Sequence, residues 1–152
     1  MTPDAFPGTW KLFVPGIPRP GGSKVPIRIG NHLGVREAGK HTAEWRSRVA
    51  LAASQAWPWP PLTCAVDLTI TFRMPRPKGH YRTGRHAGAL KPNAPRYPTG
   101  ILDATKLRRS TEDALAGIVF RNDSQVCDGP PRKRYADDEH PPGAYIAVTA
   151  ME

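Results

Sequence analysis

The sequence predicts an α+β fold in which a small mixed sheet packs against two main helices, with a long basic loop joining two of these elements. Two observations lead to this fold class. Several short segments alternate apolar and polar residues as strands do, and two longer segments repeat apolar residues at helical spacing. A chain of 152 residues has room for one hydrophobic core, so we expect residues 1–152 to form a single domain.

Alternation or a short apolar run predicts five strands. They cover residues 10–14, 25–29, 66–73, 125–128 and 144–149. The second strand ends near Gly30, and the residues that follow can return as its hairpin partner. The third is the clearest, because four apolar side chains alternate with Asp, Thr and Arg, and one face of it should lie on the core.

Two segments have the spacing of amphipathic helices. The first covers residues 42–57, with Thr42 as the expected N-cap and Pro58 as the stop. The second begins after Asp103, a good N-cap residue, and ends near Ala116.

The loop between the third strand and the second helix, residues 74–102, is rich in Pro, Gly, Arg and His and has no sustained periodicity. Residues 68–102 contain no acidic side chain, and the chain has a formal net charge of +9. An ordinary disordered basic loop is the alternative, but this charge pattern favours contact with nucleic acid, with Tyr81 and Tyr97 available to stack on bases. The expected DNA contacts are Lys24, Arg76, Lys78, Arg82, Arg85, Lys91 and Lys106.

The cysteines and the N-terminal sequence indicate a cytoplasmic protein. Cys64 and Cys127 stand far apart without a CxxC pair or a histidine cluster, so we expect reduced thiols and neither a zinc site nor a disulfide framework. The N-terminal residues do not resemble a signal peptide, and no apolar run has the length of a membrane helix. We therefore expect no membrane partner.

Three aspartates near the second helix are candidate metal ligands. Phosphodiester hydrolysis requires an activated water and neutralisation of charge on the phosphate, and Mg²⁺ held by carboxylates supplies both. Asp103 and Asp123 bracket the helix, and a short return of the chain could bring them together, with Asp128 as a third contributor. Alternatively, Asp103 is only an N-cap and Asp123 only a turn residue.

One face of the same helix carries Thr105, Arg109 and Asp113 at intervals of four residues, turned away from the apolar face. Arg109 can therefore either reach a phosphate or pair with Asp113. The alternative is a solvated face with one weak surface ion pair.

These residues occur in an order that resembles the RusA family of Holliday junction resolvases, particularly the versions carried by bacteriophages. The family pattern has a P-D-x-D-[NK]-L-x-[KR] segment, then D-A-L, then D-D-x-Q-V. Residues 103–109 read DATKLRR, residues 113–115 read DAL, and residues 122–126 read NDSQV. The likeness extends through VPGIPRPGGSK, FRMPRPKGHY, KRYAD and PPGAYIAV, and so covers nearly the whole chain.

The resemblance implies a homodimeric, Mg²⁺-dependent endonuclease, with Mn²⁺ as a second candidate ion. Such an enzyme binds four-way junctions in a bacterial cell or a phage-infected host and nicks two opposing strands during DNA recombination and repair. Carried over by position, Asp103 and Asp123 are catalytic metal-binding acids, and Arg109 is the basic residue that assists at the phosphate.

Two positions depart from the family pattern. Thr105 stands where the family has the second Asp of D-x-D, and Asn122 stands where it has the first Asp of D-D. Asp128 or a water could compensate for the lost charge. The alternative hypothesis is therefore a catalytically weakened or inactive relative that binds branched DNA without cutting it. A basic protein-interaction module is a third interpretation.

Overall fold

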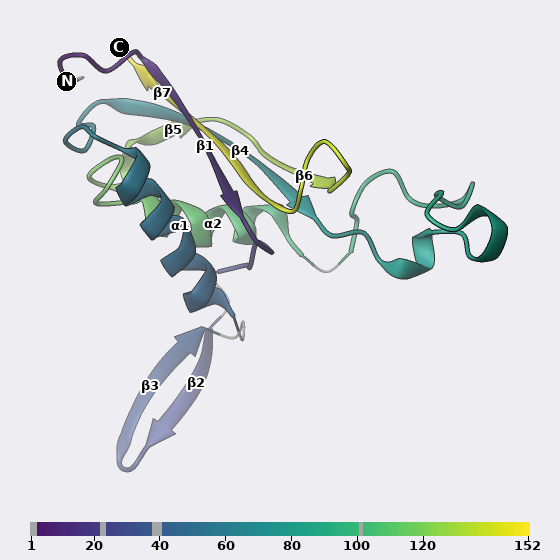
Figure 1. Ribbon diagram of the computed structural model, residues 1–152. Helices are drawn as coiled ribbons and strands as arrows, with labels where there is room; N and C mark the ends of the chain where they lie inside the picture. The colour runs from purple at the N-terminus through teal and green to yellow at the C-terminus, as the bar shows by residue number, and fades with distance from the viewer. Residues whose placement is uncertain (1–2, 22–23, 38–40, 101) are drawn as a thin grey trace.

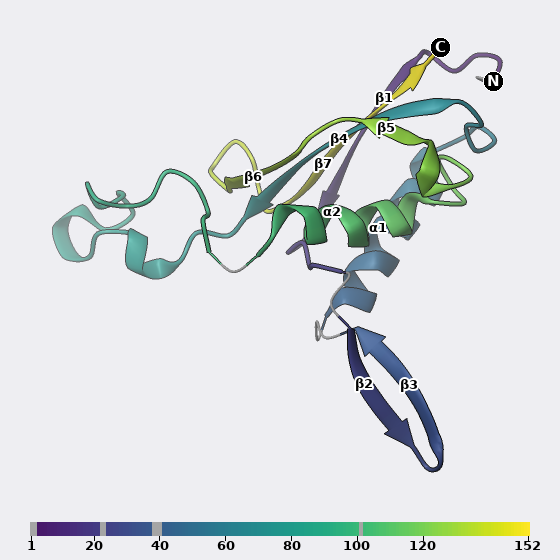
Figure 2. The ribbon, with the colours of Figure 1, turned by 180° about the vertical axis from the view of Figure 1, so that it is seen from behind.

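The computed structural model describes residues 3–21, 24–37, 41–100 and 102–152 and confirms the predicted α+β class. A five-stranded mixed sheet carries two helices on one side (Figures 1 and 2). The helices are α1 (Thr42–Ala56) and α2 (Ala104–Leu115). The strands are β1 (Thr9–Pro15), β4 (Ala65–Met74), β5 (Val126–Asp128), β6 (Pro131–Tyr135) and β7 (Gly143–Met151). In the described ranges no helix is long and apolar enough to cross a membrane.

Strand β4 is the centre of the sheet, as its strict alternation predicted. Its even-numbered side chains from Val66 to Met74 are buried, whereas the odd-numbered ones are half-buried. One face of the strand therefore lies on the core beneath the helices. Strand β7 pairs antiparallel with β4 along nearly its whole length, β1 flanks β7, and β5 and β6 pair parallel with the other edge of β4.

The two helices are joined by a buried hydrogen bond, in which the indole N–H of Trp45 in α1 donates to the hydroxyl of Thr111 in α2 at 3.1 Å. Thr42 was expected to cap α1, and this prediction was wrong. Thr42 is the first residue of the helix, and its hydroxyl donates to the Pro20 carbonyl at 2.7 Å. The N-cap is His41, which makes no side-chain cap bond. The Thr42 hydroxyl is therefore bonded to a distant segment and does not cap the helix.

Strands β2 (Lys24–Ile29) and β3 (His32–Glu37) form a separate hairpin that extends away from the sheet (Figure 1). Gly30 occupies the turn with a φ of 61°, so the predicted hairpin is confirmed. The side chain of Lys24, one of the expected DNA contacts, lies outside the described residues.

Strand β6 (sequence PRKRY) was not predicted, because its residues are mostly basic and do not alternate with apolar ones. It runs beside the end of β4, with Phe72 opposite Lys133. Between β5 and β6, Gly129 has a φ of 106°, and a Cβ there would lie 2.3 Å from the Leu68 carbonyl oxygen. The chain therefore passes too close to β4 for any side chain larger than hydrogen.

The predicted long basic loop is confirmed. It leaves the end of β4, extends away from the sheet and returns to the start of α2 (Figures 1 and 2). Two short 3₁₀ turns, Lys78–His80 and Gly84–His86, and a single bridge between Tyr81 and Leu90 are its regular structure within the described residues.

Candidate active site and nucleic-acid interface

Asp103 caps the N-terminal end of α2, as its sequence position predicted. Its Oδ1 accepts hydrogen bonds from the backbone N–H groups of Thr105 at 2.8 Å and Lys106 at 3.2 Å. The side chain is exposed, and Oδ2 has no hydrogen-bond donor among the described residues. Asp103 therefore satisfies the helix end with one oxygen and leaves the other accessible to a ligand.

Asp123 lies in the short 3₁₀ turn that follows α2, and it is exposed. The amide of Gln125 donates to the carbonyls of Leu62 and Cys64, both at 2.8 Å, and ties this turn to the residues before β4. Asn122 caps the turn by accepting from the Ser124 N–H at 3.0 Å. Asn122, which departs from the family pattern, therefore stabilises this turn.

The structure does not bring Asp103 and Asp123 together within one chain. The residue before Asp103 accepts a hydrogen bond from Lys133 Nζ at 2.7 Å, and Lys133 pairs with Phe72 near the end of β4. Asp123 is tied through Gln125 to Cys64, before the start of β4. Eight residues of extended chain separate Phe72 from Cys64, which corresponds to roughly 26 Å. One ion cannot bind both carboxylates of a single chain.

Asp128 lies in β5 opposite Asp67 of β4, and its Oδ1 accepts from the N–H of Gly129 at 2.8 Å. Both it and the neighbouring Cys127 are exposed. Throughout the part of the chain that the structure describes, no group of three or more His, Cys, Asp or Glu side chains is placed to hold a metal ion. The three predicted metal ligands therefore do not form one cluster within the described residues.

The exposed face of α2 leaves Arg109 available. Asp113 lies 3.5 Å from Arg46 of α1, so of the two alternatives for Arg109 the pairing with Asp113 is replaced by a contact between helices. Arg109 is exposed and has no ion-pair partner among the residues described. Lys106, one turn earlier, is also exposed. Arg109 lies six residues after Asp103 along α2, roughly 9 Å along the helix axis.

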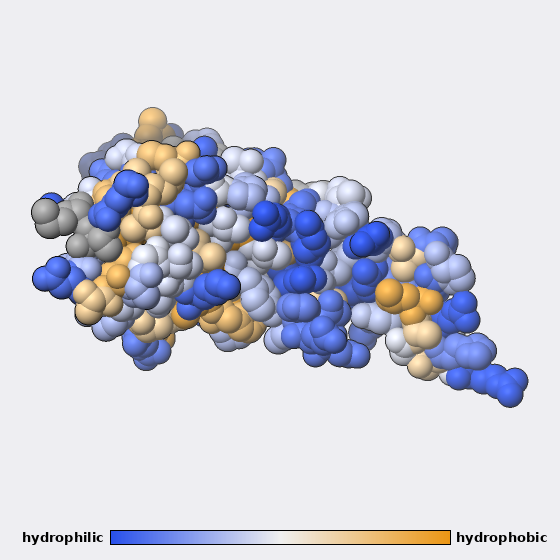
Figure 3. Space-filling view, turned by 90° about the horizontal axis from the view of Figure 1, so that it is seen from above, coloured by the Kyte–Doolittle hydropathy of each residue, from blue (hydrophilic) through white to orange (hydrophobic). Residues whose placement is uncertain are grey.

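The basic loop presents four of the expected DNA contacts as exposed side chains, namely Lys78, Arg82, Arg85 and Lys91. Arg76 differs from them because it is half-buried and holds the base of the loop. Its guanidinium donates to the Pro95 carbonyl at 2.7 Å and lies 4.0 Å from the centre of the Tyr135 ring. Seen from above, hydrophilic side chains gather over the end of the sheet from which the loop leaves (Figure 3).

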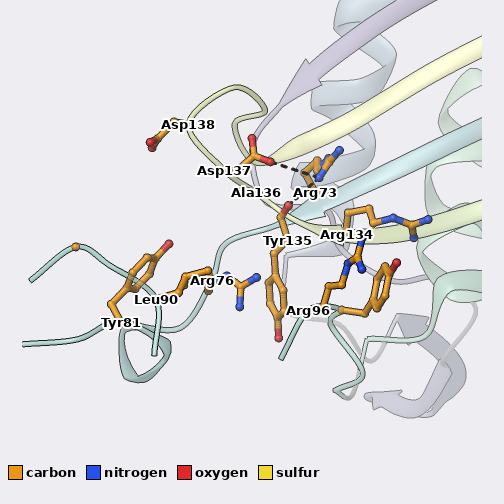
Figure 4. A pocket seen from close by; sticks show the side chains of 12 residues that line it. Arg73, Arg76, Tyr81, Leu90, Arg96, Arg134, Tyr135, Ala136, Asp137 and Asp138 are labelled. Carbon is orange, nitrogen blue, oxygen red and sulfur yellow. Dashed lines mark hydrogen bonds and ion pairs between the residues drawn. The ribbon is translucent and has the colours of Figure 1, made fainter. Parts of the chain in front are cut away.

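A cavity of about 570 Å³ lies where the loop meets β4 and β6. Four arginines line it, from three separate segments: Arg73 of β4, Arg76 and Arg96 of the loop, and Arg134 of β6 (Figure 4). Arg134 was missed by the sequence reasoning because β6 itself was missed. The basic and aromatic composition of residues 132–135 was the signal that could have indicated it.

Asp137 and its neighbours form the acidic side of this cavity. Arg73 donates from Nη1 to the Tyr135 carbonyl at 3.0 Å and lies 3.9 Å from Asp137. Hydrogen bonds from His140 lower the pKa of the Asp137 carboxyl, so this group is ionised at neutral pH. Burial raises the pKa of the nearby Tyr145 hydroxyl, and the positive charge of Arg73 partly opposes that shift.

Comparison with known proteins agrees with this arrangement. The family model for endodeoxyribonuclease RusA matches residues 27–149, a range that includes Asp103, Asp123, the basic loop, strands β4, β5 and β6 and most of β7. A comparison with curated proteins finds no match. Since the family match covers most of the sequence, the chain belongs to the RusA family of endodeoxyribonucleases.

Proposed function

We propose that this protein is a Mg²⁺-dependent endonuclease that resolves Holliday junctions by paired cuts in opposing strands. Family membership supports DNA cleavage. The single observation that carries the catalytic assignment is the exposed carboxylate of Asp103, which caps α2 with one oxygen and has the other accessible. Branched DNA is the proposed substrate, and the exposed cations of the loop are the proposed contacts to its phosphates.

The donor set at Asp103 fits a hard cation. Mg²⁺ prefers oxygen ligands, retains several waters and is commonly bound through one or two carboxylates together with substrate phosphates. When bound, the ion supplies an activated water and neutralises charge on the phosphate. Asp103 would hold it, and Arg109 would bind a phosphate oxygen through its exposed guanidinium.

A second carboxylate would come from a second copy of the chain. Asp123 lies at the far end of β4 from Asp103, so the pair cannot meet in one protomer. In a two-fold dimer, when residue i of one protomer contacts residue j of its partner, residue j of the first protomer also contacts residue i of the partner. Asp103 of each protomer can then face Asp123 of its partner, which gives two equivalent sites and suits a reaction that needs two symmetric cuts.

The proposed function is tested by incubating the purified protein with an end-labelled four-way junction in Mg²⁺ or Mn²⁺. We expect nicks at symmetric positions in two opposing strands and none in linear duplex of the same sequence. Loss of all nicking when the metal is chelated, with binding retained, supports the metal requirement. If the junction is not nicked with either ion, the nuclease assignment is wrong.

The second candidate function, binding of branched DNA without cutting, is favoured by Thr105 and Asn122. Thr105 offers a neutral hydroxyl where the family has a carboxylate, and Asn122 is engaged as the cap of the turn that contains Asp123. On this hypothesis the protein binds junctions in a salt-sensitive manner, and its site lacks the charge to retain Mg²⁺.

Under this second hypothesis, Thr105→Asp should raise the nicking rate by about 10- to 100-fold. This is the range by which activity changes when residues that surround a metal site are mutated. Thr105 is exposed in the first turn of α2, where an acid is also compatible with the helix dipole. Ala43→Asp, which adds the same charge to the first turn of α1, is the control. An unchanged rate in Thr105→Asp, starting from an active wild type, excludes a decayed site.

A further inference from the structure

The cavity at the base of the loop is larger than a phosphate contact requires. Its volume of about 570 Å³ lies within the range of sites that enclose a small organic ligand. Exposed cations such as Lys78 and Arg82 are sufficient for backbone contacts and lie elsewhere on the loop. The arginines in the cavity are instead combined with aromatic rings and two carboxylates around one open, solvent-accessible cavity.

Tyr97 is the ring in the cavity that is best placed to stack on a planar group. It is 45% exposed, and the guanidinium carbons of Arg134 and Arg96 lie over its ring at 5.0 Å and 5.5 Å from the centre, so a base would stack on the ring in place of one of them. Tyr135 is less accessible, because it is half-buried and is packed more closely, by Arg76 at 4.0 Å from the ring centre and by the edge of His80. An exposed ring next to two guanidinium groups matches the chemistry of a base with its phosphate.

The cavity also has positive and negative side chains in different parts of its wall. Figure 4 shows Asp137 beside Arg73 with Asp138 farther out, whereas Arg96 and Arg134 lie together on another side of the cavity, past Tyr135. Asp137 is paired with Arg73 at 3.9 Å, whereas Asp138 has no ion-pair partner among the described residues, so the charge of Asp138 disfavours a second phosphate on that side. A nucleotide has the complementary polarity, because its phosphate is anionic whereas the amino group of adenine, cytosine or guanine donates hydrogen bonds.

We propose that this cavity holds one unstacked nucleotide of the DNA substrate, with its phosphate at Arg96 and Arg134 and its base against Tyr97. The amino group of the base points towards Asp137 and Asp138. This proposal rests on the proposed function and adds a reason for selecting branched DNA. Removing a base from the stack costs least where pairing is already interrupted, so an occupied cavity favours a branch point over a regular duplex.

Photo-crosslinking tests the proposal directly. A four-way junction carries 5-iodocytosine at a branch-point position, is bound without metal and is irradiated, and the crosslinked peptide is identified by mass spectrometry. We expect a crosslink to Tyr97 or another cavity residue, at least about tenfold stronger than from the same base within a duplex arm, because a base in the arm must first be unpaired and unstacked. A weaker crosslink from 5-iodouracil, which lacks the amino group, is the second expected result.

Two pairs of variants provide matched controls. Tyr97→Ala should weaken binding of a short single-stranded oligonucleotide about tenfold or more, whereas Tyr97→Phe keeps the ring and should bind nearly as the wild type does. Arg134→Ala should reduce crosslinking more than Arg132→Ala, which removes the same charge from an exposed position of β6 outside the cavity. Circular dichroism establishes that each variant is folded.

The proposal is overturned if the junction is bound but the crosslink maps outside the cavity, or if Tyr97→Ala leaves oligonucleotide affinity unchanged. Nicking of the same junction in Mg²⁺ separates this failure from failure of the proposed function. A protein that nicks without a cavity crosslink is a resolvase that lacks the nucleotide site. A cavity crosslink without nicking supports the nucleotide site and contradicts the nuclease assignment.

Discussion

Asp103→Asn should reduce the nicking of four-way junctions at least about 100-fold, because loss of a direct carboxylate ligand should exceed the effect of altering its supporting partners. It should do so without lowering thermal stability or junction affinity. The side-chain oxygen of Asn replaces Oδ1 as the acceptor for the N–H groups of Thr105 and Lys106, so the cap of α2 is kept. The negative charge, and with it the strongest attraction for a divalent ion, is removed.

Two further variants separate catalysis from folding. Asp103→Ala loses the cap as well as the charge, and it should lower the free energy of unfolding by about 1 kcal/mol, the usual cost of an N-cap replacement. Asp113→Asn removes the same charge from the exposed face of α2 while leaving the helix end unaltered. Nicking by Asp103→Asn at the rate of Asp113→Asn would show that Asp103 is only a helix cap.

Mixing two inactive variants should restore nicking if each site takes Asp103 from one protomer and Asp123 from the other. Asp103→Asn and Asp123→Asn should each be inactive alone, because every site in those dimers lacks one carboxylate. In a mixed dimer, one of the two sites contains both altered residues and the other contains both intact ones. An equal mixture after subunit exchange should therefore regain about a quarter of the wild-type nicking rate, since half of the dimers have one of two sites intact.

The pattern of products provides an internal check on the mixing experiment. A mixed dimer with one working site should nick one strand of a junction and leave the opposing strand intact, so single nicks should predominate over paired cuts. Mixing each inactive variant with more of itself is the control. An inactive mixture, in which native mass spectrometry of one isotope-labelled and one unlabelled variant detects mixed dimers, would contradict a site shared between protomers.

Local sequence patterns were sufficient wherever neighbouring residues decide the structure. The alternation along β4 predicted its buried face, and Asp103 predicted the start of α2 because an N-cap bonds to residues only two and three positions away. The hairpin turn at Gly30 is equally local. Each of these elements is stabilised by contacts that a short window of sequence contains.

Local patterns were not sufficient where a side chain bonds to a segment that is distant in the sequence. Thr42 has the chemistry of an N-cap, yet it donates to the Pro20 carbonyl. The Arg109–Asp113 pair, one of two alternatives for Arg109, is likewise replaced, because Arg46 of α1 is the ion-pair partner of Asp113. Strand β6 has no apolar alternation and is defined by its parallel pairing with the end of β4.

The sequence by itself therefore determined the fold class, the principal strands and helices, the basic loop and the ordered acidic motif. Only the tertiary structure decided that Asp103 and Asp123 lie at opposite ends of β4, and that Arg73, Arg96 and Arg134 line one cavity. The physical reason is that caps, turns and amphipathic faces depend on residues a few positions apart. The distance between two active-site candidates depends on how strands pair, and that pairing is set by the packing of the whole core.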